Sequence, residues 1–349
     1  MSVREYANFF HLWCVFFIVM QKYEKKAIKT VMGIIKNALR RFLFFFCNKR
    51  HPLMNTRKFF TYLLVTIAVG MWGVSFVLTK AIFNSDPNYT ASIVLIFRLL
   101  FSVVLFVPLL FVIKKARRIQ RGDWKFFLGL ALMEPFLYFL CENTGLMYIS
   151  SGLASMIVGL IPVFVPFGML IAYGERISLM NVLGGVVSLL GIATMILGSG
   201  AGFDSELAGI LLLFAAVSVT VFYSLILRKI VDRYPPVTIT VYQNVIGIFY
   251  FLPLLLFVDM DNLQAIHFTA KALVCMAALG IGCSTLAYVF FYYGIRRMGA
   301  SSVFVFSNAT PVFTMIFACA IGQEELTLLK VLGMAVALSG VCLAQIKRT

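Results

Sequence analysis

A stretch of this chain occurs twice, and the repetition constrains the fold more strongly than any other feature of the sequence. The first copy runs from Gly145 to Gly191 and the second from Gly294 to Gly340. Each copy contains a Pro-Val-Phe triplet, a glutamate in the next loop and a series of glycines, and the copies align without gaps. A repeat of this kind indicates that one structural unit has been duplicated. The residues that coincide are Pro162 with Pro311, Glu175 with Glu324, Gly184 with Gly333, and Gly191 with Gly340.

The repeated unit consists of apolar segments that are long enough to cross a membrane. Hydrophobic residues make up 61% of the chain and charged residues 13%, whereas soluble domains carry about 25% charged residues. A helix spans the hydrocarbon core with about 20 apolar residues. We therefore predict an all-α integral membrane protein with ten transmembrane helices. The segments lie at about 59–82, 91–113, 125–146, 150–172, 179–198, 207–227, 238–258, 270–291, 301–321 and 328–346.

The charges between these segments predict the orientation in the membrane. Lys and Arg precede the first segment, occupy the loops after the second, fourth, sixth and eighth segments, and end the chain. The other loops are mainly acidic. Positively charged loops stay in the cytoplasm, so we predict a multi-pass protein of the inner (cell) membrane with both termini cytoplasmic. This placement accounts for the net charge of +16 without a nucleic-acid partner.

The repeat and the topology together predict two halves with opposite orientation. Residues 54–200 form the first five-helix repeat and residues 201–349 the second. Because five is an odd number of crossings, Glu175 lies in a cytoplasmic loop and Glu324 in an external one. Inverted repeats with a site between them, near the middle of the membrane, are a recurrent plan of transporters.

Residues 1–53 differ in character from the rest of the chain. Ile28–Phe46 has apolar residues on one helical face and basic residues on another, which is typical of an amphipathic helix on an anionic membrane surface. The short apolar run Phe9–Met20 lacks a following cleavage site of small residues, which disfavours a signal peptide. Translation from Met54 is the alternative, in which the leader is a mis-assigned start. We assign the leader no role in transport.

The motifs of both halves resemble those of a known family. The Pro-Val-Phe triplet, the Gly-Glu-Arg-Ile-Ser loop beginning at Gly174 and the later glycines are similar to the EamA-type drug/metabolite transporters. The first segment, with Gly70-Met71-Trp72-Gly73, and the arginine Arg98 in the second also resemble that family. The resemblance covers residues from about 56 to 347. It implies a ten-helix carrier with inverted repeats, and many members export amino acids, other metabolites or drugs. Gln323-Glu324-Glu325 departs from the loop motif in the second copy.

Ionisable side chains in the first half are the strongest candidates for a binding site. Glu134, Tyr138 and Glu142 follow one another at helical spacing in the third segment, and Arg98 lies at a similar depth in the second. A charge at that depth costs about 2.5–3.5 kcal/mol unless it is paired or hydrated, and such residues usually mark substrate or ion pathways. We expect an ion pair between Arg98 and one of the glutamates. A purely structural buried pair is the alternative interpretation.

Other polar and aromatic residues extend the predicted substrate site. Trp72 lies in the first segment, Gln243 and Asn244 lie inside the seventh, Tyr288 and Tyr292 share a face of the eighth, and Asn308 precedes the proline of the ninth. Together they favour an amphipathic cavity for a small organic solute. The prolines Pro162 and Pro311 predict kinks or mobile helices near mid-membrane. The glycines Gly184, Gly191, Gly333 and Gly340 predict close helix packing, within a monomer or across a homodimer.

These features predict a secondary transporter rather than an enzyme. The sequence has no ATP-binding motif, hydrolase triad, metal-ligand cluster or cofactor motif, and its cysteines and histidines are scattered. We expect alternating-access transport of an amino acid, metabolite or drug-like compound, in the direction of export, by a monomer or homodimer whose other partner is membrane lipid. The alternatives are an antiporter for an anionic metabolite with Arg98 as ligand, and a non-carrier such as a lipid flippase.

Overall fold

The structure, a computed structural model, describes residues 56–113, 118–198, 203–298 and 300–345, and each regular element in these ranges is helical. The predicted leader, residues 1–53, lies outside them. The longer helices are α3 (Thr56–Phe83), α4 (Ala91–Ile113), α9 (Leu179–Leu197), α10 (Phe203–Leu227), α11 (Pro236–Phe257) and α17 (Leu328–Ala344). The shorter helices are α5 (Trp124–Ala131), α6 (Tyr138–Tyr148), α7 (Ser151–Val158), α8 (Ile161–Tyr173), α12 (Met260–Ala265), α13 (Ala270–Ala277), α14 (Ala287–Met298), α15 (Ala300–Ser307) and α16 (Thr310–Ala320).

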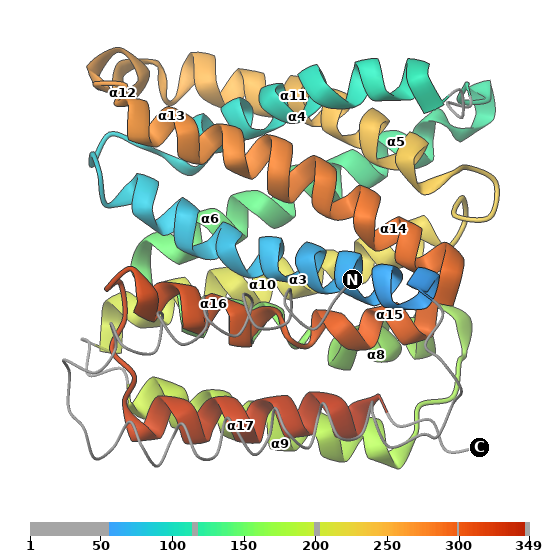
Figure 1. The fold of residues 1–349 in the computed structure, drawn as a ribbon, viewed down its shortest axis with the longest axis vertical. Helices are drawn as coiled ribbons and strands as arrows, with labels where there is room; N and C mark the ends of the chain where they lie inside the picture. Colours follow the sequence, from blue (N-terminus) through green and yellow to red (C-terminus); the bar gives the residue numbers. More distant parts are fainter. Residues whose placement is uncertain (1–55, 114–117, 199–202, 299, 346–349) are drawn as a thin grey trace. The chain divides into compact units, whose positions relative to one another are not determined.

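Apolar helices cross the molecule repeatedly, which identifies a multi-pass membrane protein. In the described ranges, 7 helical stretches are long and apolar enough to cross a membrane. Three shorter apolar helices accompany them, at Ala91–Val107, Val305–Ala320 and Leu328–Ala344. Large apolar side chains such as Leu190, Leu197 and Leu328 are more than half exposed, as expected for surfaces in contact with lipid acyl chains. A helical stretch lies at each position where the sequence predicts a segment (Figure 1).

The third and eighth apolar segments are interrupted at matching positions. Leu132–Leu137 joins α5 to α6, and Ala278–Leu286 joins α13 to α14, both as π-helical stretches. These stretches coincide when the two halves of the sequence are aligned. Within the first, Glu134 has an extended backbone with φ −140° and ψ 121°. Such interruptions turn backbone groups away from the regular helical hydrogen bonds and are frequent at functional sites.

The fourth and ninth segments each consist of two helices. The first breaks between α7 and α8, and Pro162 lies in the first turn of α8. The second breaks between α15 and α16, and Pro311 lies in the first turn of α16. Proline suits the first turn because the backbone N–H it lacks has no partner there. The two prolines therefore begin new helices, and the kinks predicted from the sequence are breaks between helices.

The fifth and tenth segments, α9 and α17, pack antiparallel along their lengths (Figure 1). Near the start of α9, a Cβ added at Gly184 would meet the Gly340 carbonyl oxygen at 2.4 Å. Near its end, a Cβ at Gly191 would meet the Gly333 carbonyl oxygen at 2.6 Å. Between them, Ser188 donates a hydrogen bond to the Ala337 carbonyl at 3.1 Å. The glycine stripes of the two repeats thus meet each other within one chain.

Candidate functional site

A small cavity lies among the interrupted segments and their neighbours. Side chains from both halves of the chain contribute to it. The lining residues are Glu134, Pro135 and Phe139 from the third segment, Tyr223 from α10, Thr240, Gln243 and Asn244 from α11, and Ser284, Tyr288 and Tyr292 from the eighth segment.

Glu134 is the only residue with an ionisable carboxyl among those lining residues. Its Oε1 accepts a hydrogen bond from the Tyr288 hydroxyl at 3.3 Å. Its backbone carbonyl, in the interrupted part of the segment, accepts one from Gln243 Nε2 at 2.7 Å. The Tyr223 hydroxyl in turn donates to Gln243 Oε1 at 3.4 Å. Hydrogen bonds from the second half therefore hold the carboxylate and its backbone at the cavity wall, as irregular backbone within a membrane requires.

Aromatic rings form a second part of the wall. The rings of Tyr288 and Tyr292 have centroids 5.9 Å apart, and Trp72 packs edge-on against Tyr288 at 5.2 Å. The indole Nε1 of Trp72 donates to the Cys283 carbonyl at 3.2 Å, so the ring is fixed behind the tyrosines. The hydroxyls of Tyr292 and Thr240 lie 3.1 Å apart. The wall presents both apolar ring surface and hydroxyl groups to a bound solute.

Arg98 is buried beside this site, and the ion pair predicted for it from the sequence is wrong. Its side chain is 4% exposed, and its Nε donates to Ser284 Oγ at 2.7 Å. Its guanidinium lies over the Phe139 ring, 4.4 Å from the centroid. Among the described residues, Arg98 forms an ion pair with neither Glu134 nor Glu142. A hydroxyl and an aromatic face accommodate the cation instead, and Arg98 is absent from the cavity lining.

Tyr138 and Glu142 form a buried pair outside the cavity lining. The Tyr138 hydroxyl donates to Glu142 Oε1 at 2.9 Å, as their spacing of one helical turn allows. Asn143 Nδ2 lies 3.5 Å from the other carboxylate oxygen. Both Tyr138 and Glu142 are 8% exposed, and neither lines the cavity. The interruption at Leu132–Leu137 separates them from Glu134, which the sequence placed on the same helical face.

The residue pair formed by Arg98 and Ser284 has an equivalent pair in the repeat, but the two pairs make different kinds of contact. Arg98 coincides with Gly247 in the aligned halves, and Pro135 coincides with Ser284. Arg98 contacts Ser284 through a hydrogen bond, whereas Gly247 contacts Pro135 through close packing. A Cβ at Gly247 would meet Pro135 Cγ at 2.4 Å. The site therefore lies where the two repeats meet, and its polar groups differ between them.

The structure brings together only part of the predicted site. Glu134, Tyr288 and Tyr292 line the cavity, Trp72 supports it, and Asn308 lies elsewhere, paired with Gln345 through two amide hydrogen bonds of 3.0 and 2.9 Å. Phe139, Tyr223, Thr240 and Ser284 were not predicted from the sequence. Gln243 and Asn244, which were predicted from the sequence, line the cavity. Thr240 lies three and four residues before them, so it shares their polar face on the apolar helix α11 and could have been found in the same way.

Comparison with known proteins gives a consistent family and fold. The EamA-like transporter family matches the chain twice, over residues 59–197 and 207–345. An "Uncharacterized transporter" of Archaeoglobus fulgidus is 26% identical over 82% of this chain and 99% of its own. The "Uncharacterized transporter YvbV" of Bacillus subtilis is 26% identical over 82% and 92%.

Two further matches are more distant. The "Probable terminal-alkyne amino-acid exporter" of Streptantibioticus cattleyicolor is 25% identical over 58% of this chain and 66% of its own. A protein of known crystal structure has the same fold, with a TM-score of 0.57 over 79% of this chain and 97% of that one at 16% identity.

Proposed function

Because this chain belongs to the EamA-like transporter family, we propose that it is a secondary carrier that moves a small organic solute through the Glu134 cavity by alternating access. The observation that carries the proposal is a cavity built from both repeats around one carboxylate at an interrupted helix. Transporters of inverted-repeat design bind their substrates in such places.

The ten apolar segments cross the membrane as two inverted five-helix repeats in this proposal. The antiparallel packing of α9 and α17, which are equivalent segments of the two repeats, supports opposite orientations. The family match to each half supports the duplication. The basic loops define an inner end, which includes Arg176, Arg228 and Arg297, and the loop with Glu324 lies at the outer end. Both termini are then cytoplasmic in the cell membrane.

The chemistry of the cavity favours a solute that carries a protonated amine. Glu134 supplies a carboxylate, and Tyr223, Tyr288 and Tyr292 supply ring faces and hydroxyls. Carboxylates and aromatic faces both attract ammonium groups. The anionic-metabolite alternative requires a cation at the wall, and Arg98 is engaged by Ser284 and Phe139 instead. The name of the amino-acid exporter among the relatives supports zwitterionic solutes and the export direction.

A flux experiment with matched probes tests this function. The purified protein is reconstituted in proteoliposomes, and uptake and efflux are measured for phenethylamine, phenylalanine and phenylpropionate. We expect saturable flux of the probes with an amine, and a loss of about tenfold or more with Glu134→Gln, because a charge-assisted contact is removed. Glu325→Gln, an exposed loop substitution, is the matched control. Flux of phenylpropionate alone, or full activity of Glu134→Gln, would refute the proposal.

A further inference from the structure

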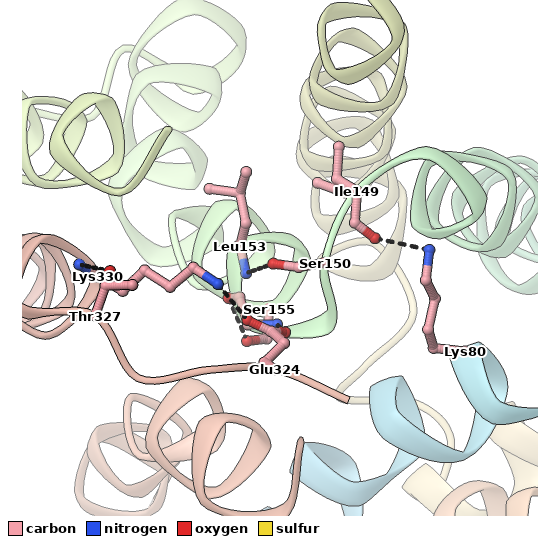
Figure 2. A network of polar contacts seen from close by, with 9 residues as sticks. Lys80, Ile149, Ser150, Leu153, Ser155, Glu324, Thr327 and Lys330 are labelled. Atoms are coloured by element: carbon pink, nitrogen blue, oxygen red, sulfur yellow. Dashed lines mark hydrogen bonds and ion pairs between the residues drawn. The ribbon is translucent and has the colours of Figure 1, made fainter. Parts of the chain in front are cut away.

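Glu324, in the loop between α16 and α17, joins three parts of the outer end (Figure 2). Its Oε1 accepts a hydrogen bond from the backbone N–H of Gly152, in the first turn of α7, at 2.6 Å. Its Oε2 lies 3.5 Å from Lys330 Nζ, in the first turn of α17. The Glu324 side chain is only 4% exposed. A carboxylate is well placed at the start of a helix, where N–H groups lack partners and the helix dipole is positive.

Neighbouring contacts close the same end of the molecule. Gln323 Nε2 donates to the Val77 carbonyl near the end of α3 at 3.0 Å. Lys80, in the last turn of α3, donates to the Leu146 carbonyl in α6 at 2.8 Å. It also donates to the carbonyl of Ile149, directly after α6, at 3.1 Å (Figure 2). These bonds tie the second-half loop and the first-half helices α3, α6 and α7 together.

Close packing beneath Glu324 completes the closure. A Cβ added at Gly152 would meet Met315 Cε at 2.6 Å and the two Glu324 carboxylate oxygens at 3.1 and 3.2 Å. Pro311 Cγ lies 3.4 Å from the corresponding position on Gly159. The outer halves of the fourth and ninth segments, α7 and α16, are therefore in contact. A glycine at position 152 lets the carboxylate reach the backbone of α7.

The repeat-equivalent Glu175 has a different environment at the inner end. It pairs with Arg228, and the two side chains are 46% and 44% exposed. The cavity residues Tyr223, Thr240 and Tyr292 all lie within about two helical turns of the inner ends of their helices. Glu324 is thus buried at the outer end, whereas its counterpart Glu175 is partly exposed at the inner end, which is nearer the cavity.

We propose that Glu324, through Gly152 and Lys330, is a latch that holds the outer end closed while the cavity is accessible from the inner end. Outward opening separates α16 and its loop from α7, and breaks the Glu324–Gly152 hydrogen bond. This inference rests on the proposed alternating-access function. It assigns to Glu324 a role in setting the populations of the two states rather than in binding the solute.

Side-specific labelling tests the latch separately from transport. The seven cysteines are replaced, Thr240→Cys is introduced in the cavity wall as reporter, and a membrane-impermeant maleimide is applied to either face of oriented vesicles. We expect labelling of the parent mainly from the inner face. Glu324→Ala should raise labelling from the outer face by about fivefold or more, which is the size of effect typical of a lost coupling contact.

Matched variants make the result specific. Gly152→Ala disturbs the same contact from α7 and should act in the same direction as Glu324→Ala. Glu325→Ala, at the adjacent exposed position, should leave outer labelling at the parent level. Unchanged outer labelling in both Glu324→Ala and Gly152→Ala, with the parent reporter still labelled from the inner face, would overturn the latch alone. A reporter that reacts from neither face would contradict the cavity assignment of the proposed carrier, and the latch with it.

Discussion

Gly191 of α9 and Gly333 of α17 lie so close that a Cβ added to either would meet the carbonyl oxygen of the other at 2.6 Å. Under the alignment of the repeats, this contact is equivalent to the one between Gly340 and Gly184. The contact set is therefore self-complementary, as two copies of one surface related by a pseudo-two-fold axis require. An antiparallel pair of equivalent helices is what inverted repeats produce.

Gly191→Ala should destabilise the protein, because the new methyl group would meet the Ala337 backbone nitrogen at 2.3 Å and α9 and α17 would have to separate. We expect a loss of about 1–3 kcal/mol, the usual effect of overpacking. The measurement is thermal unfolding of the purified protein in detergent. Gly122→Ala is the matched control, because nothing lies within 4 Å of a Cβ there. Equal melting temperatures for the two variants would contradict the packing described.

Much of this fold is predictable from the sequence, because membrane helices need long apolar segments and the repeat fixes their correspondence. The interruptions at Leu132–Leu137 and Ala278–Leu286 are not predictable from apolar periodicity, although Pro135, which lacks a backbone donor, marks the first. The incorrect prediction of an ion pair for Arg98 has the same origin. The sequence placed Arg98 and Glu134 at similar depths in the membrane, which suggested that their opposite charges would pair. In the structure, the Glu134 carboxylate accepts a hydrogen bond from Tyr288, and Arg98 donates one to Ser284 instead.

Tyr288→Phe should weaken transport less than Glu134→Gln, because it removes a hydrogen bond to the carboxylate and keeps the ring in the wall. The net contribution of this single hydrogen bond is about 1 kcal/mol, which corresponds to a change of about fivefold in the KM for the amine. The assay is concentration-dependent uptake in proteoliposomes. Tyr250→Phe serves as control, since its hydroxyl bonds the Leu128 carbonyl outside the cavity. A larger effect at Tyr250 than at Tyr288 would argue against the assigned wall.

Arg98→Ala should reduce stability and leave the proposed preference for amines over carboxylates in place. The substitution removes the bond to Ser284 and the contact with Phe139, at a cost of about 2 kcal/mol for a charged, buried hydrogen bond. Melting temperature and the ratio of phenethylamine to phenylpropionate flux are the two measurements. If Arg98 were an anion ligand, the substitution would abolish carboxylate flux while amine flux persisted.

A cluster of polar residues in the loops before α5 and α11 predicts a pH dependence of stability. Asp123 is buried and accepts hydrogen bonds from Arg233 Nη1 and the Tyr234 hydroxyl, both at 2.7 Å. Burial, together with the Asp123 carboxylate, raises the pKa of Tyr234 above its ordinary value of 10.0. Because the pKa of Tyr234 is higher in the folded state than in the unfolded state, its contribution to stability is fully present at pH values below the unfolded-state pKa.

This stabilisation is lost as the pH rises from the unfolded pKa through the folded one, because the unfolded state then releases its proton first. The parent should therefore lose stability above pH 10 more steeply than Tyr234→Phe, whose side chain cannot titrate. Melting curves between pH 7 and pH 11 provide the measurement. Parallel pH profiles for the two proteins would show that Tyr234 contributes no such linkage.

Binding of an amine to the purified protein tests most directly whether Glu134 holds the solute. Affinities of phenethylamine and its neutral analogue ethylbenzene are measured by titration calorimetry for the parent and for Glu134→Gln, with Glu325→Gln as control. Loss of the amine and loss of the carboxylate should each weaken binding by about tenfold. Ethylbenzene should bind Glu134→Gln no more weakly than it binds the parent, because both changes remove the same ammonium–carboxylate contact. Additive losses, or equal affinity of the parent for both compounds, would contradict the account.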